Sequence, residues 1–145
     1  MALPKKKFRE AVLQILFCNQ FSSAFEEQAL IPFMMREFQV TKRRVREVLA
    51  FASNVLEKAG ECDALIARFS HEFSLERIPW VERSVLRLAL FELLFQPEIP
   101  PKVAFSEAIR LARKFATRES ARFIHALLDA VYKDSCAEKP SLSAG

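Results

Sequence analysis

The chain has 145 residues, of which 51% are hydrophobic and 28% charged, and its formal net charge is +4 at pH 7. That length suits one domain or two tightly fused helical subdomains, and the apolar fraction excludes a disordered protein. Because the chain has only two glycines but fourteen phenylalanines, its composition favours an all-α fold packed around large side chains.

The first two helices are predicted from apolar side chains that recur at three- and four-residue steps. The helix over residues 4–19 has an expected inner face made of Phe8, Ala11, Val12, Ile15 and Leu16. The helix over residues 24–38 has an expected inner face made of Phe25, Ala29, Phe33 and Met34.

A long third helix is predicted to begin after Thr41, whose hydroxyl suits the N-terminal cap of a helix. Its expected inner face is the stripe Val45, Val48, Leu49, Ala52, Val55 and Leu56. Gly60 is expected to end this helix in the left-handed conformation that glycine adopts readily. The three helices would form an antiparallel bundle, which is the first helical subdomain, about residues 4–60.

The second half is predicted to start with a short helix over residues 62–69 and a loop through Ser74 and Ile78. The helix over residues 80–95 is apolar on almost every side, so it is expected to be central and buried. The proline-rich segment 96–101 is expected to be a rigid connector.

Two further helices are predicted over residues 102–116 and 119–132, with Thr117 or Ser120 near the break between them. They complete a second helical subdomain, about residues 61–133. The last twelve positions, 134–145, mix small, charged and proline residues, and we expect a flexible tail there.

The cysteines and histidines give no sign of a metal site. Cys18, Cys62 and Cys136 form no CxxC pair, and the two histidines stand apart from each other. Three free thiols suit a reducing compartment, and the N-terminus lacks the pattern of a signal peptide. No apolar run approaches the roughly 18 residues of a membrane span. We therefore expect a cytoplasmic protein without a membrane segment.

Basic residues gather in three runs. They are Lys5, Lys6, Lys7 and Arg9; Lys42, Arg43, Arg44 and Arg46; and Arg110, Arg113, Lys114, Arg118 and Arg122. One such run is usually a solvated helix face. Three runs on a small chain make a polyanionic partner about as probable as a merely solvated surface. The first run lies at a helix start, where the helix dipole disfavours cations, so a functional reason for it gains weight.

The motifs of common enzymes are missing from the sequence. It contains no GxxxxGK[ST], GxGxxG, HExxH or GxSxG pattern, and two glycines cannot build a phosphate-cradling loop. His71 and His125 are interpreted as ordinary surface or half-buried side chains. We expect no cofactor, no metal and no enzymatic activity.

Four stretches of the second half carry a family resemblance. They are LRLALFEL at 86–93, IPPKVAFSEA at 99–108, ARKF at 112–115 and SARFIHALLD at 120–129. The first helix adds its basic run, then Arg9-Glu10-Ala11, and then Gln14, Leu16 and Phe17. This succession resembles the NusB family over about residues 5–133, because the order and spacing of the motifs are specific although each is weak alone.

The resemblance implies an all-α, NusB-like fold of about seven helices in two fused subdomains, with residues 1–133 as a single RNA-binding domain. It also implies a role in transcription antitermination. Such a protein binds the single-stranded boxA element of ribosomal-operon RNA together with NusE, a small-subunit ribosomal protein. The resulting complex helps RNA polymerase read through terminators. A helical protein-interaction module with only incidental RNA binding is the alternative.

The resemblance also implies candidate site residues. The family's basic N-terminal stretch falls on Lys5, Lys6, Lys7 and Arg9, which would contact RNA phosphates. Phe123 is the candidate ring for stacking an unpaired base, although a core position explains it equally well. Lys102 would either touch phosphate or cap its turn.

The partner-binding positions implied by the resemblance are Phe17, Glu76 and Glu82, whose carboxylates would pair with a basic segment of NusE. A surface charge or a local salt bridge is the alternative for each glutamate. The sequence departs from the family pattern at Ser106 and at His125-Ala126, and its N-terminal run is mostly lysine instead of arginine.

Overall fold

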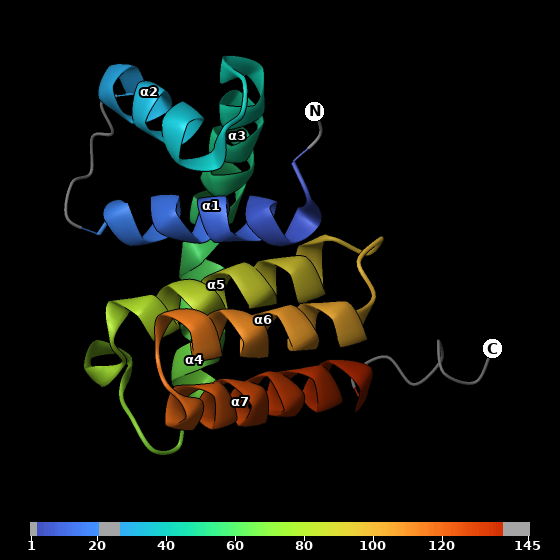
Figure 1. Ribbon diagram of the computed structural model, residues 1–145. Helices are drawn as coiled ribbons and strands as arrows, with labels where there is room; N and C mark the ends of the chain where they lie inside the picture. Colours follow the sequence, from blue (N-terminus) through green and yellow to red (C-terminus); the bar gives the residue numbers. More distant parts are fainter. Residues whose placement is uncertain (1–2, 21–26, 138–145) are drawn as a thin grey trace. The chain divides into compact units, whose positions relative to one another are not determined.

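The computed structural model of the chain describes residues 3–20 and 27–137 (Figure 1). Within those residues it contains seven α-helices and one short 3-10 helix, and no strand. The predicted all-α fold of about seven helices is confirmed. The chain divides into two compact units, Met1–Lys58 and Ala59–Gly145, which are described separately below.

The first unit contains α1 (Lys5–Cys18), α2 (Glu27–Phe38) and α3 (Lys42–Glu57). The predicted inner face of α1 is confirmed, since Ala11, Val12, Ile15 and Leu16 are almost completely buried. Phe8 completes this face and meets the ring of Phe51 on α3 edge-on, with 5.5 Å between ring centroids. The expected antiparallel bundle is wrong, because α1 lies across α3 (Figure 1).

The inner face predicted for α2 is mostly wrong. Met34 is buried as expected, but Ala29 is exposed and the Phe33 side chain is 47% exposed. Within residues 29–38 of this helix, Ile31 is the other buried residue, three positions before Met34. The predicted start of the helix and the inward position of Phe25 lie outside the described residues. Pro32 lies within the helix.

The start predicted for α3 is confirmed, but its predicted end is wrong. Thr41 caps the helix, its Oγ1 accepting a hydrogen bond from the backbone N–H of Arg44 at 3.3 Å. The helix ends at Glu57, and Gly60 lies inside α4 without a positive φ. The left-handed conformation falls instead on Gln39, directly after α2, with φ 53°.

The second unit contains α4 (Ala59–Phe69), the 3-10 helix η1 (Leu75–Arg77), α5 (Trp80–Phe95), α6 (Pro101–Phe115) and α7 (Arg118–Ala137). In Figure 1, α5, α6 and α7 lie side by side. The central position predicted for α5 is confirmed: it packs against α4, α6 and α7, and every residue from 83 to 92 is buried. The loop expected through Ser74 and Ile78 contains η1, which the sequence did not predict.

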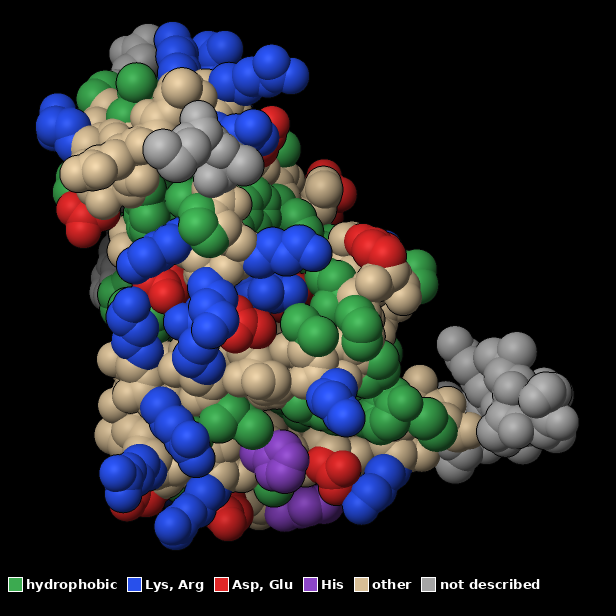
Figure 2. Space-filling model, turned by 45° about the vertical axis from the view of Figure 1, so that its right-hand side comes forward, with side chains coloured by type: hydrophobic (Ala, Val, Ile, Leu, Met, Phe, Trp, Pro, Cys, Tyr) green, Lys and Arg blue, Asp and Glu red, His purple; other side chains and the backbone are tan. Residues whose placement is uncertain are grey.

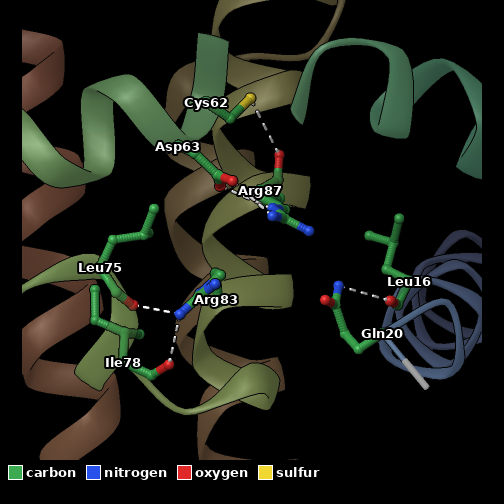
Figure 3. Close-up of polar contacts among 8 residues, drawn as sticks. All are labelled: Leu16, Gln20, Cys62, Asp63, Leu75, Ile78, Arg83 and Arg87. Carbon is green, nitrogen blue, oxygen red and sulfur yellow. Dashed lines mark hydrogen bonds and ion pairs between the residues drawn. The ribbon is translucent and has the colours of Figure 1, made fainter. Parts of the chain in front are cut away.

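Two arginines of α5 hold neighbouring elements in place (Figure 3). Arg87 donates two hydrogen bonds to Asp63 of α4, from Nε to Oδ1 at 2.8 Å and from NH2 to Oδ2 at 2.6 Å. Arg83 donates to the backbone carbonyls of Leu75 and Ile78, and its guanidinium stacks on the Trp80 ring at 3.9 Å. The carboxylate of Asp63 compensates the buried charge of Arg87, whereas Arg83 is held only by carbonyls and the Trp80 ring, and its Nε has no hydrogen-bond partner among the described residues. The carbonyl contacts of Arg83 fix η1 against α5.

The break between the last two helices is at Thr117. Its Oγ1 accepts a hydrogen bond from the Ser120 N–H at 3.0 Å, in the manner of an N-terminal cap. α7 then continues to Ala137, so residues 134–137, expected in the tail, are helical; the rest of the predicted tail lies outside the described residues. No helix in the described ranges is both long and apolar enough to cross a membrane.

Candidate functional site

The basic run on α1 presents three lysines and buries its arginine. Lys5–Lys7 form the first turn of the helix and are exposed, whereas Arg9 is only 8% exposed. Lys7 lies 3.7 Å from the carboxylate of Glu10 but keeps 54% of its side chain in solvent. No acidic residue stands in this first turn. The surface charge of the run therefore comes from the lysines, and Arg9 has little surface left for a partner.

The lysine run is carried by a firmly packed helix. Phe8, inside the run, is half-buried and packs on Phe51 of α3. The backbone N–H of Phe8 also donates to the Pro4 carbonyl at 2.9 Å, which closes the first turn. The positive charges are therefore displayed from a fixed platform, which lowers the entropy lost when they bind a ligand.

Phe123 lies half-buried in the second turn of α7. Its ring meets that of Phe73 edge-on, with centroids 5.5 Å apart and an angle of 82° between the ring planes. The ring lines a hollow of about 290 Å³ between α5, α7 and the loop before α5. Phe123 is therefore neither a core residue nor a free surface ring, and one side of it is accessible from this hollow.

The acidic residue Glu82 lines the same hollow as Phe123. Its Oε2 accepts a hydrogen bond from Ser120 Oγ at 2.9 Å, which orients the carboxylate. Glu76 is exposed on η1 and lines an adjoining hollow that also includes Phe73. The structure thus brings together residues that the sequence assigned to different partners, RNA for Phe123 and a protein for the glutamates.

Seven further residues of this hollow were not assigned to a site from the sequence. They are Glu72, Phe73, Arg77, Ile78, Pro79, Glu119 and Ser120, so the hollow has three glutamates and one arginine in its lining. Glu119 could have been found, because it precedes Phe123 by four positions and so shares its helix face. Glu72 and Phe73 carry no such signal, because a loop brings them there. We call the whole set, with Glu82 and Phe123, the acidic hollow.

Lys102 and Phe17 are not among the residues that line the acidic hollow. Lys102 is exposed in the first turn of α6 and makes no ion pair or hydrogen bond within the part of the chain that the structure describes. It stands at the opposite end of α6 from the break at Thr117, whereas Phe123 follows that break closely. Phe17 is half-buried in the last turn of α1, in the first unit.

The remaining basic runs are only partly neutralised. In the second run, Arg44 NH1 binds Glu47 Oε2 at 2.9 Å, while Lys42, Arg43 and Arg46 are exposed. In the third run, Arg110 donates twice to Glu107, at 2.9 and 3.0 Å. Among the described residues no group of His, Cys, Asp and Glu is arranged to hold a metal ion.

Together these features define an all-α binding protein, which presents a lysine run on one unit and an acidic, aromatic hollow on the other. The sequence profile of the NusB family matches residues 6–133. The chain belongs to the NusB family, and the predicted resemblance is confirmed.

Three known proteins illustrate the relationship. The transcription antitermination protein NusB of Chlamydia pneumoniae is 35% identical over 140 residues, which cover 97% of this chain and 87% of that protein. The structure of T. maritima NusB matches with a TM-score of 0.76 at 32% identity, over 92% of this chain and 93% of that one. A chain in the crystal structure of antitermination factors NusB and NusE with dsRNA shares the fold, with a TM-score of 0.74, 23% identity, and coverage of 90% and 96%.

Proposed function

We propose that this protein is a transcription antitermination factor, which binds boxA-like single-stranded RNA of ribosomal operons together with NusE. It would then help RNA polymerase to read through terminators. The observation that carries the proposal is the exposed run Lys5–Lys7 on the first helix of a chain that belongs to the NusB family. The relative from Chlamydia pneumoniae is itself named for transcription antitermination.

RNA binding is expected to depend on charge and on stacking. Lys5–Lys7 and Lys102 are exposed cations that can neutralise phosphates and release counterions from the RNA. Phe123 offers one side of its ring to an unpaired base, and such stacking is tolerant of sequence. Arg9 contributes through packing more than through phosphate contact, since it is buried.

NusE binding is expected to use the acidic hollow, Glu76 in the adjoining hollow, and Phe17. Glu76 and Glu82 offer carboxylates to a basic segment, and charge-assisted hydrogen bonds of this kind are stronger than neutral ones. The protein named NusB in a solved complex is found with NusE and dsRNA. In this proposal the protein is not an enzyme, and it works in the cytoplasm, where nascent RNA is made.

A protein-interaction module with incidental RNA binding is the second candidate. The acidic character of the hollow around Phe123 favours it, because carboxylates repel phosphates. The two candidates are separated by a variant in which Lys5, Lys6 and Lys7 are all alanine. If that variant still captures NusE and retains full antitermination, the interaction module is correct and the RNA-binding proposal is wrong.

The proposed function is tested by titrating a fluorescent boxA RNA with the full chain at several salt concentrations, with and without NusE. We expect tighter binding to boxA than to a scrambled RNA, and a further gain when NusE is present. Three lysines that each neutralise one phosphate contribute about −2 to the slope of log K against log salt, which the triple alanine variant should lose. A slope that is unchanged in this variant would contradict the role of the lysine run.

A further inference from the structure

A basic groove lies between α6 and α7, on unit 2 and apart from the acidic hollow. It has a volume of about 370 Å³ and is lined by Ile109, Arg113, Arg118, Ala121, Arg122 and His125. In the lower part of Figure 2, lysine, arginine and histidine side chains lie beside a few carboxylates. The three arginines belong to the third basic run, but none of them is among the candidate site residues.

Helical spacing explains why these side chains meet. Arg118, Arg122 and His125 follow one another at four- and three-residue steps, so they share one face of α7. On α6, Ile109 and Arg113 are one turn apart and face the same groove. Ala121, only 3% exposed, contributes a methyl group to the floor, so its small side chain leaves the space open.

The three arginines of this groove make no intramolecular polar contact among the described residues. Arg113, Arg118 and Arg122 make no ion pair, hydrogen bond or ring contact with any residue of the described ranges, 3–20 and 27–137. Arg110, in the same basic run, differs: it is held by two hydrogen bonds to Glu107. The groove thus keeps the planar donors of three guanidinium groups available to a ligand.

The local arrangement of these charges works against the stability of the helix. Arg118 is the first residue of α7, where the positive end of the helix dipole repels a cation. Arg118 and Arg122 are also like charges four positions apart, which destabilises a helix further. An anion bound in the groove would relieve both repulsions, and the N-terminus of α7 would add its own attraction for it.

We propose that this groove binds consecutive phosphates of a single-stranded RNA, as a second backbone contact besides the lysine run. The inference rests on the proposed function, because it assigns a further part of the same RNA ligand. Guanidinium groups suit this role, since they bind phosphate through two parallel hydrogen bonds whereas a lysine offers a point charge. No carboxylate lines the groove, although Arg122 also lines a neighbouring hollow together with Glu72 and Glu119.

The test compares two variants that lose the same charge from different places. In R113Q/R118Q/R122Q the groove loses three charges; in the control K42Q/R43Q/R46Q, α3 loses three exposed charges. The probe is an oligouridine of about twelve nucleotides, because backbone contacts carry no sequence information. We expect the groove variant to bind this RNA roughly tenfold to a hundredfold more weakly at 0.1 M salt, with a slope reduced by about 2, and the control to change less than about threefold.

A charge-preserving variant, R113K/R118K/R122K, guards against an effect on folding. It should retain the salt slope of the unmodified chain and lose only part of the affinity, and circular dichroism should show equal helicity in all three variants. Unchanged oligouridine binding by the groove variant overturns the inference. This is also the result expected if the groove binds an acidic protein segment instead of RNA. Equal losses in the groove variant and the α3 control also overturn it, because only total charge would then matter.

This test remains separate from that of the proposed function. The proposed function fails if the unmodified chain does not prefer boxA to scrambled RNA or does not respond to NusE. The groove inference fails if the groove variant binds oligouridine as tightly as the unmodified chain does, or loses no more affinity than the α3 control. Neither measurement involves boxA or NusE.

Discussion

Ser120 on α7 donates a hydrogen bond to the carboxylate of Glu82 on α5, with 2.9 Å between Oγ and Oε2. The hydroxyl of Thr117 in turn donates to Ser120 Oγ at 2.9 Å. This relay fixes the orientation of one carboxylate at the edge of the acidic hollow, while its second oxygen makes no described hydrogen bond. A preoriented carboxylate loses little freedom on binding, so Glu82 is well prepared to accept a donor from a basic protein segment.

Replacing Glu82 with glutamine is expected to weaken NusE binding about tenfold, because a charge-assisted hydrogen bond is lost while the side-chain shape is kept. Isothermal titration calorimetry with purified NusE measures the change. The matched control is Ser120→Ala, which keeps the charge and removes only its orientation, and which should cost less affinity. Equal binding by E82Q and the unmodified chain would rule out Glu82 as a partner contact.

Replacing Phe123 with leucine is expected to weaken boxA RNA binding by about fivefold to a hundredfold, the range for loss of one stacked base. Leucine keeps an apolar side chain beside Phe73, so the melting temperature should change little. Phe33→Leu is the control, because Phe33 is an exposed ring on α2 outside every candidate site. If both variants bind RNA equally well, Phe123 is a packing residue only.

Asp63→Asn is expected to lower the free energy of unfolding by about 2 to 4 kcal/mol, because it leaves the guanidinium of Arg87 without its charged partner. The two side chains are 11% and 21% exposed, so solvent can screen little of the loss. Urea unfolding followed by circular dichroism measures it. Asp129→Asn is the control: this aspartate pairs with Lys133 in solvent, and its loss should cost no more than about 0.5 kcal/mol.

The three cysteines are expected to differ in reactivity. Burial raises the pKa of the Cys62 thiol to about 12, whereas Cys18 and Cys136 are exposed. At pH 8 a thiol reagent should therefore modify two cysteines in the native protein and the third only after unfolding, as mass spectrometry of the labelled peptides will show. Rapid native labelling of Cys62 would contradict the burial of α4 against α5.

The raised pKa of Cys62 also predicts an effect of alkaline pH on stability. The unfolded thiol ionises near pH 9 but the native one only near pH 12. The stabilising contribution of the neutral thiol is therefore complete below pH 9 and is lost as the pH rises from 9 to 12. Cys62→Ala should remove this part of the alkaline loss, as unfolding curves at pH 8 and pH 10.5 can show.

Helix periodicity predicted the faces of α1 and α5 because their apolar positions are either cleanly spaced or nearly continuous. It failed for α2, where residues 29–35 are apolar all round and no stripe stands out. Gly60 misled for another reason: glycine permits a left-handed stop but does not require one, and Gln39 adopts that conformation instead. The residue type thus limits which backbone conformations are accessible, and tertiary packing selects one of them.

The candidate site could be predicted residue by residue but not as an arrangement. The lysines of α1 were evident from charge, yet the burial of Arg9 depends on the packing of α1 in its unit. Glu82 and Ser120 are 38 positions apart, so their hydrogen bond cannot be deduced from helical spacing. The basic groove was visible only as a run of charges until the structure showed which arginines have partners.

Terminator read-through in a purified transcription reaction tests the central claim most directly. The reaction contains RNA polymerase, NusE, a boxA-bearing template and either the full chain or its K5A/K6A/K7A variant. We expect the full chain to raise read-through only when boxA and NusE are both present, and the variant to raise it much less. Read-through that is independent of boxA, or equal for the variant, would contradict it.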